Sequence, residues 1–180
     1  MTEKERQQVL EQLAASQKKL VEAVRPLTPA QWRFRESPGR WSAEEIVEHL
    51  LLFEGFIRGV VARTLAQPAE PEKQTQAPGK EPLVLGLANS RDRRIDAREV
   101  VRPTGRAWER DELLARLDAA RAETLAFAST TEAPLHEHFF AHLAFGDLDC
   151  RQWLLVLSQH TARHVLQIEE IQRAAGYPEE

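Results

Sequence analysis

The sequence predicts an all-α fold: a four-helix bundle with one long crossover between its second and third helices. Four stretches repeat apolar residues every three or four positions, which is the period of one helix face. No stretch shows the alternation typical of a strand. Residues 67–108, rich in proline, separate the second helix from the third. A connection this long can cross the bundle lengthwise, which would make the helices on either side of it parallel.

The first two predicted elements are a long helix and a single turn. Residues 2–24 carry an apolar stripe and stop before Pro26, because a residue that precedes proline disfavours the α conformation. Thr28 can then cap a short turn that begins at Pro29, a residue suited to the first helical position. A turn follows at residues 37–40.

The second long helix is expected at residues 42–66. Ser42 is the predicted N-cap, and Glu45 completes a capping box three residues later. The stripe of this helix consists of Ile46, His49, Phe53, Phe56 and Val60.

Beyond the second helix we expect a crossover and two further helices. Residues 67–82 suggest an extended loop, and the apolar segment 83–87 should lie over the bundle. The third helix is predicted at 109–130, and an irregular segment at 131–149. The fourth helix runs over about 150–175, with Gly176 as its C-cap glycine.

Composition indicates an ordinary globular protein with a single domain over residues 1–180. The net charge of −4 argues against nucleic acid as a partner. A local group of arginines is interspersed with acidic residues and suggests a solvated loop: Arg91, Arg93, Arg94 and Arg98. No apolar run reaches the ~20 residues of a membrane span, and no signal peptide is evident. Cys150 is the one cysteine, so no internal disulfide can form. These features fit a cytoplasmic protein.

Three histidines fall in predicted apolar stripes. His160 and His164 lie one turn apart in the fourth helix, and His49 lies in the second. Three neutral imidazoles suit a zinc, nickel or copper ion, and catalytic zinc sites often use three protein ligands. The alternative is that each histidine is a hydrogen-bonded core residue. The zinc-protease helix motif is absent, since no glutamate separates the pair.

Other histidines and Cys150 are further candidates. His136 and His138 could face the mouth of such a site and transfer protons, or could lie in a solvated loop. His142 has aromatic neighbours in sequence, which favours packing. Cys150 could be a nucleophile, but a small buried residue is the simpler interpretation.

Two polar residues next to the three histidines could orient their rings. Gln167 and Glu48 each lie within one turn of a candidate ligand, and either could accept an imidazole N–H, or else lie at the surface. The four tryptophans suggest core packing, and one of them could line a pocket above the ion: Trp32, Trp41, Trp108 and Trp153.

The segments 41–50 (WSAEEIVEHL) and 160–168 (HTARHVLQI) resemble the second and fourth helices of the DinB/YfiT-like superfamily. Segment 27–31 (LTPAQ) resembles the family's short link after the first helix. The resemblance covers most of the chain, and is weakest at 67–108 and 131–148. It implies a four-helix bundle with a crossover, often a homodimer, and a divalent metal site, usually zinc or nickel, at His49, His160 and His164.

The family resemblance also implies a range of activities. Its members include thiol-dependent transferases, which use a low-molecular-weight thiol as co-substrate, and proteins described as metal-dependent hydrolases. We therefore expect a metal-dependent transferase or hydrolase of small molecules, with a slight preference for transfer. The alternatives are a non-catalytic, stress-related binding module with a structural metal, and a bundle without metal whose histidines only pack.

Overall fold

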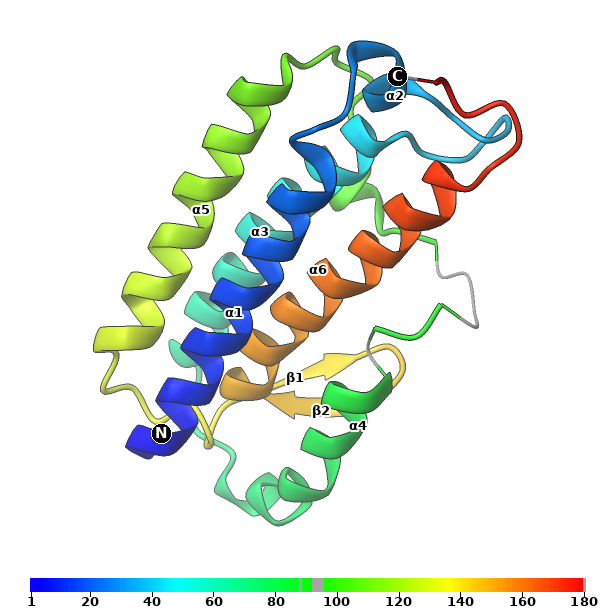
Figure 1. The fold of residues 1–180 in the computed structure, drawn as a ribbon. Helices are drawn as coiled ribbons and strands as arrows, with labels where there is room; N and C mark the ends of the chain where they lie inside the picture. Colours follow the sequence, from blue (N-terminus) through cyan, green and yellow to red (C-terminus); the bar gives the residue numbers. More distant parts are fainter. Residues whose placement is uncertain (88, 92–95, 180) are drawn as a thin grey trace.

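A computed structural model describes residues 1–87, 89–91 and 96–179 of the chain (Figure 1). Four long helices form a bundle: α1 (Glu3–Val24), α3 (Ala43–Leu65), α5 (Arg110–Thr130) and α6 (Cys150–Gln172). α1 and α6 run in one direction, and α3 and α5 run in the other (Figure 1). Each helix packs against two neighbours in the cyclic order α1, α6, α3, α5. The predicted bundle class and the parallel orientation of α3 and α5 are confirmed.

Capping boxes fix where the helices begin. The Ser42 hydroxyl accepts the Glu45 amide N–H, and the Glu45 carboxylate accepts the Ser42 amide in return. Asp149 with Gln152 forms the same arrangement at the start of α6. The predicted turn is also present, as α2 (Pro29–Arg33) with Thr28 as its cap.

The end of α6 differs from the prediction. The helix stops at Gln172, and its C-cap is Arg173 rather than Gly176. The amides of Arg173 and Ala174 bond carbonyls three residues back, which tightens and closes the last turn. Gly176 lies in the turn that follows, at φ +78°.

One ion pair is buried at the centre of the bundle. Arg121 on α5 makes a two-pronged contact with Glu54 on α3, with N–O distances of 2.9 and 2.8 Å. Its other N–H groups donate to Leu13 O and Ser16 on α1 and to Thr161 on α6. A single guanidinium therefore contacts all four long helices.

The crossover is more ordered than expected. Residues 67–82 were predicted as an extended loop, but they contain the 3₁₀ helices η1 (Pro71–Gln76) and η2 (Pro78–Lys80). The predicted apolar segment forms α4 (Glu81–Leu87), whose Val84 is fully buried. α4 packs against α6, so the expected position over the bundle is confirmed. The 3₁₀ helix η3 (Glu99–Val101) then packs against α3.

The arginine group in the crossover has a different environment from the one expected. Arg93 and Arg94 lie outside the described residues. Arg98 is exposed, as predicted. Arg91 is partly buried: its guanidinium makes a two-pronged contact with Glu170 on α6, at 3.1 and 2.7 Å.

A small hairpin replaces the irregular segment predicted before the fourth helix. Strands β1 (Phe139–His142) and β2 (Gly146–Asp149) pair antiparallel, with Phe139 opposite Asp149. Gly146 adopts φ +68° at the turn. The indole N–H of Trp153 on α6 donates to Phe140 O at 2.9 Å, which ties the hairpin to the bundle. Within the described residues, no helix is long and apolar enough to cross a membrane.

Candidate metal centre

The structure brings His49, His160 and His164 together between α3 and α6. One ring nitrogen from each lies within 4.8 Å of the others. The Nε2 atoms of His49 and His160 are 2.9 Å apart. His49 and His164 are buried, and His160 is partly buried. The helical periodicity predicts that the three rings meet only if α3 faces α6. The two helices do face each other, and the three rings meet between them.

Two of the three rings are held through their outer nitrogen. His49 Nδ1 donates to the Val101 carbonyl at 2.6 Å, and His164 Nδ1 donates to Gln167 Oε1 at 3.0 Å. The Val101 oxygen is a backbone carbonyl that can only accept, so Nδ1 carries the proton in His49. The Gln167 amide turns its oxygen toward His164, and this orientation places the proton on Nδ1 of that ring as well. Nε2 is then left with its lone pair, which is the form that ligates a metal ion.

The surroundings favour the neutral form of all three imidazoles. Burial is the main cause that lowers the pKa of His49, despite the opposing bond to Val101. Burial also lowers the pKa of His160 and His164 well below the usual value, and the neighbouring histidines lower both further. A site that disfavours imidazolium at neutral pH favours ligation of a cation.

Aromatic rings form the walls of the histidine cluster. Trp41 lies with its ring centroid 4.9 Å from that of His49 and 6.3 Å from that of His164. Phe53 stacks on His160 at 4.0 Å. Of the four tryptophans, Trp41 is thus the one beside the site, while the other three are buried: Trp32, Trp108 and Trp153.

The donor set fits a divalent transition metal. Imidazole nitrogens lie about 2.0–2.1 Å from zinc, so two of them in a tetrahedral site are about 3.3 Å apart. The 2.9 Å between His49 and His160 is close to that separation. In the neutral pair one of these nitrogens donates to the other, and a cation would need the lone pairs of both.

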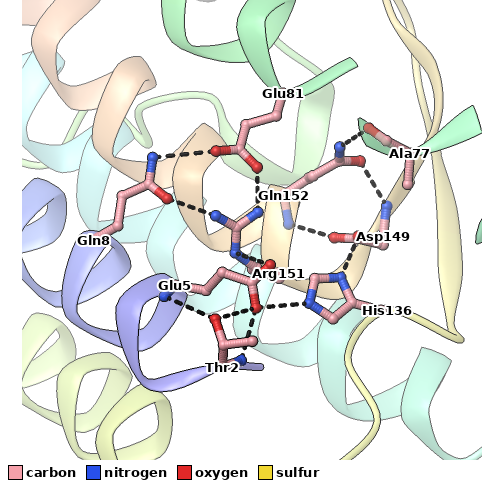
Figure 2. A network of polar contacts seen from close by, with 9 residues as sticks. All are labelled: Thr2, Glu5, Gln8, Ala77, Glu81, His136, Asp149, Arg151 and Gln152. Carbon is pink, nitrogen blue, oxygen red and sulfur yellow. Dashed lines mark hydrogen bonds and ion pairs between the residues drawn. The ribbon is translucent and has the colours of Figure 1, made fainter. Parts of the chain in front are cut away.

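His136 and His138 lie elsewhere. His136 donates to the Asp149 carboxylate at 2.9 Å and contacts Glu5 at 3.3 Å, at the hairpin end of the bundle (Figure 2). His138 is buried and donates to the Thr64 carbonyl at 3.1 Å. Neither belongs to the histidine cluster: His138 is buried, and His136 is partly exposed but held by its two carboxylate partners.

Of the remaining candidate residues, only Gln167 contacts the histidine cluster. His142 stacks on Phe145 at a centroid distance of 4.7 Å, so the packing interpretation is confirmed. Cys150 is buried, and burial raises the pKa of its thiol to about 12, which argues against an activated nucleophile at neutral pH. Glu48 is buried but bonds Thr104 on the crossover, not an imidazole. Gln167 does orient a histidine, as predicted.

The sequence profile of the DinB superfamily matches residues 12–168. The chain belongs to the DinB superfamily. This match covers the three histidines, the whole of α3 and α5 and most of α1 and α6, and it confirms the family that the segments 41–50 and 160–168 resemble.

Two Bacillus subtilis proteins are similar to this DinB chain. YuaE of strain 168, an uncharacterized protein, is 25% identical over 139 residues, which cover 76% of this chain and 80% of YuaE. The solved structure of YfiT superposes with a TM-score of 0.58 over 99% of this chain and 91% of YfiT, at 17% identity. YfiT is described as a probable metal-dependent hydrolase with an unusual four-helix bundle topology. At this identity, the likeness shows a shared fold.

Two groups in this DinB site could not be found from the sequence. The first is the Val101 carbonyl, since a backbone oxygen leaves no trace in residue type. The second is Arg91, which contacts Gln167 as well as Glu170. An arginine followed closely by acidic residues looks like any solvated loop, so only its partner on α6 distinguishes it.

Proposed function

We propose that this DinB chain is a metal-dependent hydrolase of small molecules, in which His49, His160 and His164 hold one divalent ion, zinc or nickel. The observation that carries the proposal is the convergence of three imidazoles from α3 and α6, two of which have their Nδ1 atom within hydrogen-bond distance of a carbonyl oxygen. The description of YfiT as a probable metal-dependent hydrolase favours hydrolysis as the reaction.

The chain would contribute the metal ligands, the hydrogen bonds that orient their rings, and aromatic side chains that exclude water from one side of the site. A bound divalent ion acts as a Lewis acid and generates a nucleophile from water at neutral pH. The three histidines would hold such an ion and would leave its remaining positions for water or substrate. Trp41 and Phe53 lie against the rings and exclude bulk water from that side, which strengthens electrostatic interactions within the site.

Thiol transfer remains the second candidate activity, because it rests on the family resemblance of the two histidine-bearing segments. In that case a low-molecular-weight thiol would occupy the open position instead of water. A non-catalytic module would hold a coordinatively closed ion. Cobalt-substituted protein separates these cases, since azide or a thiol changes the visible spectrum only if a position is open.

The first prediction concerns metal content. Untagged protein incubated with zinc or nickel should retain about one equivalent per chain, measured by mass spectrometry. His49→Ala and His164→Ala should each lose the metal, because each leaves only two ligands. His49→Ala leaves the two histidines of α6, and His164→Ala leaves one histidine on α3 and one on α6.

His142→Ala is the matched control, since this histidine lies outside the cluster and should leave the metal content unchanged. Wild-type protein that retains no metal would contradict the metal centre and leave the three histidines as core residues. Metal retained with no exchangeable position would contradict the enzyme and favour a structural ion.

The proposed function also carries expectations about partners, location and oligomeric state. We expect a small-molecule substrate, no nucleic acid partner and a cytoplasmic location. Sedimentation will test the homodimer that the family resemblance implies.

A further inference from the structure

The hydrogen bond between His164 Nδ1 and the Gln167 side chain can form in two orientations of the amide. Gln167 is an amide, and its side chain can present either the oxygen or the NH₂ group to the His164 Nδ1 atom. If the oxygen faces the ring, Nδ1 carries the proton and Nε2 is free to ligate. If the NH₂ group faces the ring, Nδ1 must accept, and the proton moves to Nε2, which blocks ligation.

Arg91 stands where it can decide between these two orientations. Its Nη1 atom lies 3.4 Å from Gln167 Oε1, the same oxygen that accepts from His164 Nδ1 at 3.0 Å. A guanidinium has only donors, so it stabilises the amide oxygen at this position and repels the NH₂ group. Gln167 is buried, so water does not compete freely for the amide.

Glu170 holds the guanidinium in place for this task. The Glu170 carboxylate accepts hydrogen bonds from Arg91 Nε at 3.1 Å and from Nη2 at 2.7 Å. This two-pronged contact leaves Nη1 directed at Gln167. Gln167 and Glu170 are three residues apart on α6 and therefore lie side by side on one face. The contact therefore joins a residue of the crossover to α6.

We propose that Arg91 is a positioning residue of the metal centre: through the Gln167 amide it sets the tautomer of His164 and leaves Nε2 free for the ion. This inference rests on the proposed function. Partners of this kind, one step removed from the metal, typically change metal affinity by about 10–100-fold when they are lost. The crossover would then orient two ligands, since its Val101 carbonyl holds His49.

The test combines zinc affinity with the tautomer of His164. Affinity is measured by competition with a chromophoric chelator, and the tautomer by ¹⁵N NMR of the full chain without added metal. Arg91→Ala should weaken zinc binding about tenfold and shift His164 toward the tautomer with the proton on Nε2. Arg173→Ala is the matched control, because it removes an exposed arginine from its pair with Glu169 on the same helix and should change neither quantity.

A rescue variant separates positioning from general structural support. In the double variant R91A/Q167E, residue 167 is a carboxylate that can only accept, so it should restore the Nδ1 proton without Arg91. We expect both the tautomer and most of the affinity to return. Arg91→Lys, which keeps a donor-only head, should retain both. Arg91→Gln, whose head can accept as well as donate, should lose both and serves as the working variant if R91A does not fold.

Distinct results overturn the two proposals. If wild-type protein binds zinc but R91A binds equally well with an unchanged tautomer, the role of Arg91 is excluded and the metal centre stands. The same conclusion follows if R91A/Q167E does not restore the Nδ1 proton. If wild-type protein binds no zinc or nickel, the proposed function fails, and the inference fails with it.

Discussion

The two carboxylate partners of His136 favour its charged form. Its Nδ1 faces the Asp149 carboxylate and its Nε2 faces Glu5, and ionised carboxylates only accept, so both ring nitrogens must donate (Figure 2). The bond to Asp149, aided by both carboxylate charges, raises the pKa of His136 against the effect of burial. Burial alone would raise the pKa of Glu5, but its bonds to Thr2 and His136 lower it to about 2. The imidazolium thus joins the N-terminal capping boxes of α1 and α6.

This link predicts a pH dependence of stability. The folded pKa of His136 is raised, so its contribution is complete below pH ~6.5 and is lost as the pH rises through the folded value. We expect the free energy of unfolding to fall by up to about 1 kcal/mol on that account, a size typical of partly exposed ion pairs. Urea titrations of wild type and His136→Gln between pH 5.5 and 8.5 measure it as the difference between the two curves.

The difference is needed because the histidine cluster acts with the opposite sign. His49, His160 and His164 have lowered pKa values, so they destabilise the fold as the pH falls. These three histidines are present in both wild type and His136→Gln, so their contributions to the pH dependence cancel in the difference between the two curves. Parallel curves for wild type and His136→Gln across the whole range would show that His136 is not charged by the fold.

The residues of the candidate site could be found in the sequence where they lie on a helix. The four-residue spacing of His160 and His164, and the position of His49 in its stripe, follow from the helical period. Groups that depend on tertiary contacts could not be found. The acceptor for His49 is a crossover backbone oxygen, and the acidic partners of His136 lie 131 and 13 residues away along the chain.

Among the elements, the start of α3 matters because this helix carries His49. Ser42→Ala should lower the free energy of unfolding by about 1 kcal/mol, since it removes the side chain that accepts the Glu45 amide. Chemical denaturation measures the change. Ser129→Ala, near the end of α5 and exposed, is the control and should stay within about 0.5 kcal/mol. Equal effects of the two substitutions would argue against the capping role.

Element boundaries were predictable where local chemistry sets them, as at the boxes of Ser42 and Thr28. The hairpin was not, because its strands have only four residues each, and their order depends on packing. Leu148 is fully buried, and Phe140 is tied through its carbonyl to Trp153. Residues 67–82 were similarly misjudged, since their prolines suit 3₁₀ helices as well as extended chain.

At the scale of the molecule, the Arg121–Glu54 pair joins all four long helices. Arg121→Met or Glu54→Leu alone should each cost about 3–5 kcal/mol of unfolding free energy, because either leaves an unpaired buried charge. The double variant should lose much less than the sum of the two, and urea titration of all four proteins gives the coupling energy.

Arg58 and Glu123 provide the matched comparison, since they pair the same two helices at the surface. The cycle Arg58→Met with Glu123→Leu should give at most about 1 kcal/mol of coupling. If the two cycles gave the same coupling energy, burial would not be what makes the central pair important.

The bundle topology was predictable from one length, that of the crossover, because it lets α3 and α5 run parallel. The central pair was not predicted, although a signal existed. Glu54 falls four residues after Leu50 and three before Ile57, so a carboxylate interrupts an apolar face. A single sequence could not show that its partner lies 67 residues further along.

The pairing of α1 with α6 has a consequence during synthesis on the ribosome. α1 ends at Val24 and its partner α6 begins at Cys150, so at about 5–20 residues per second the nascent chain waits several seconds or more. Throughout that interval the apolar stripe of the first helix, with Val9, Leu13 and Leu20, lacks the surface that finally buries it. Fast translation of the second half, or a chaperone that holds the first helix, should therefore raise the yield of folded protein.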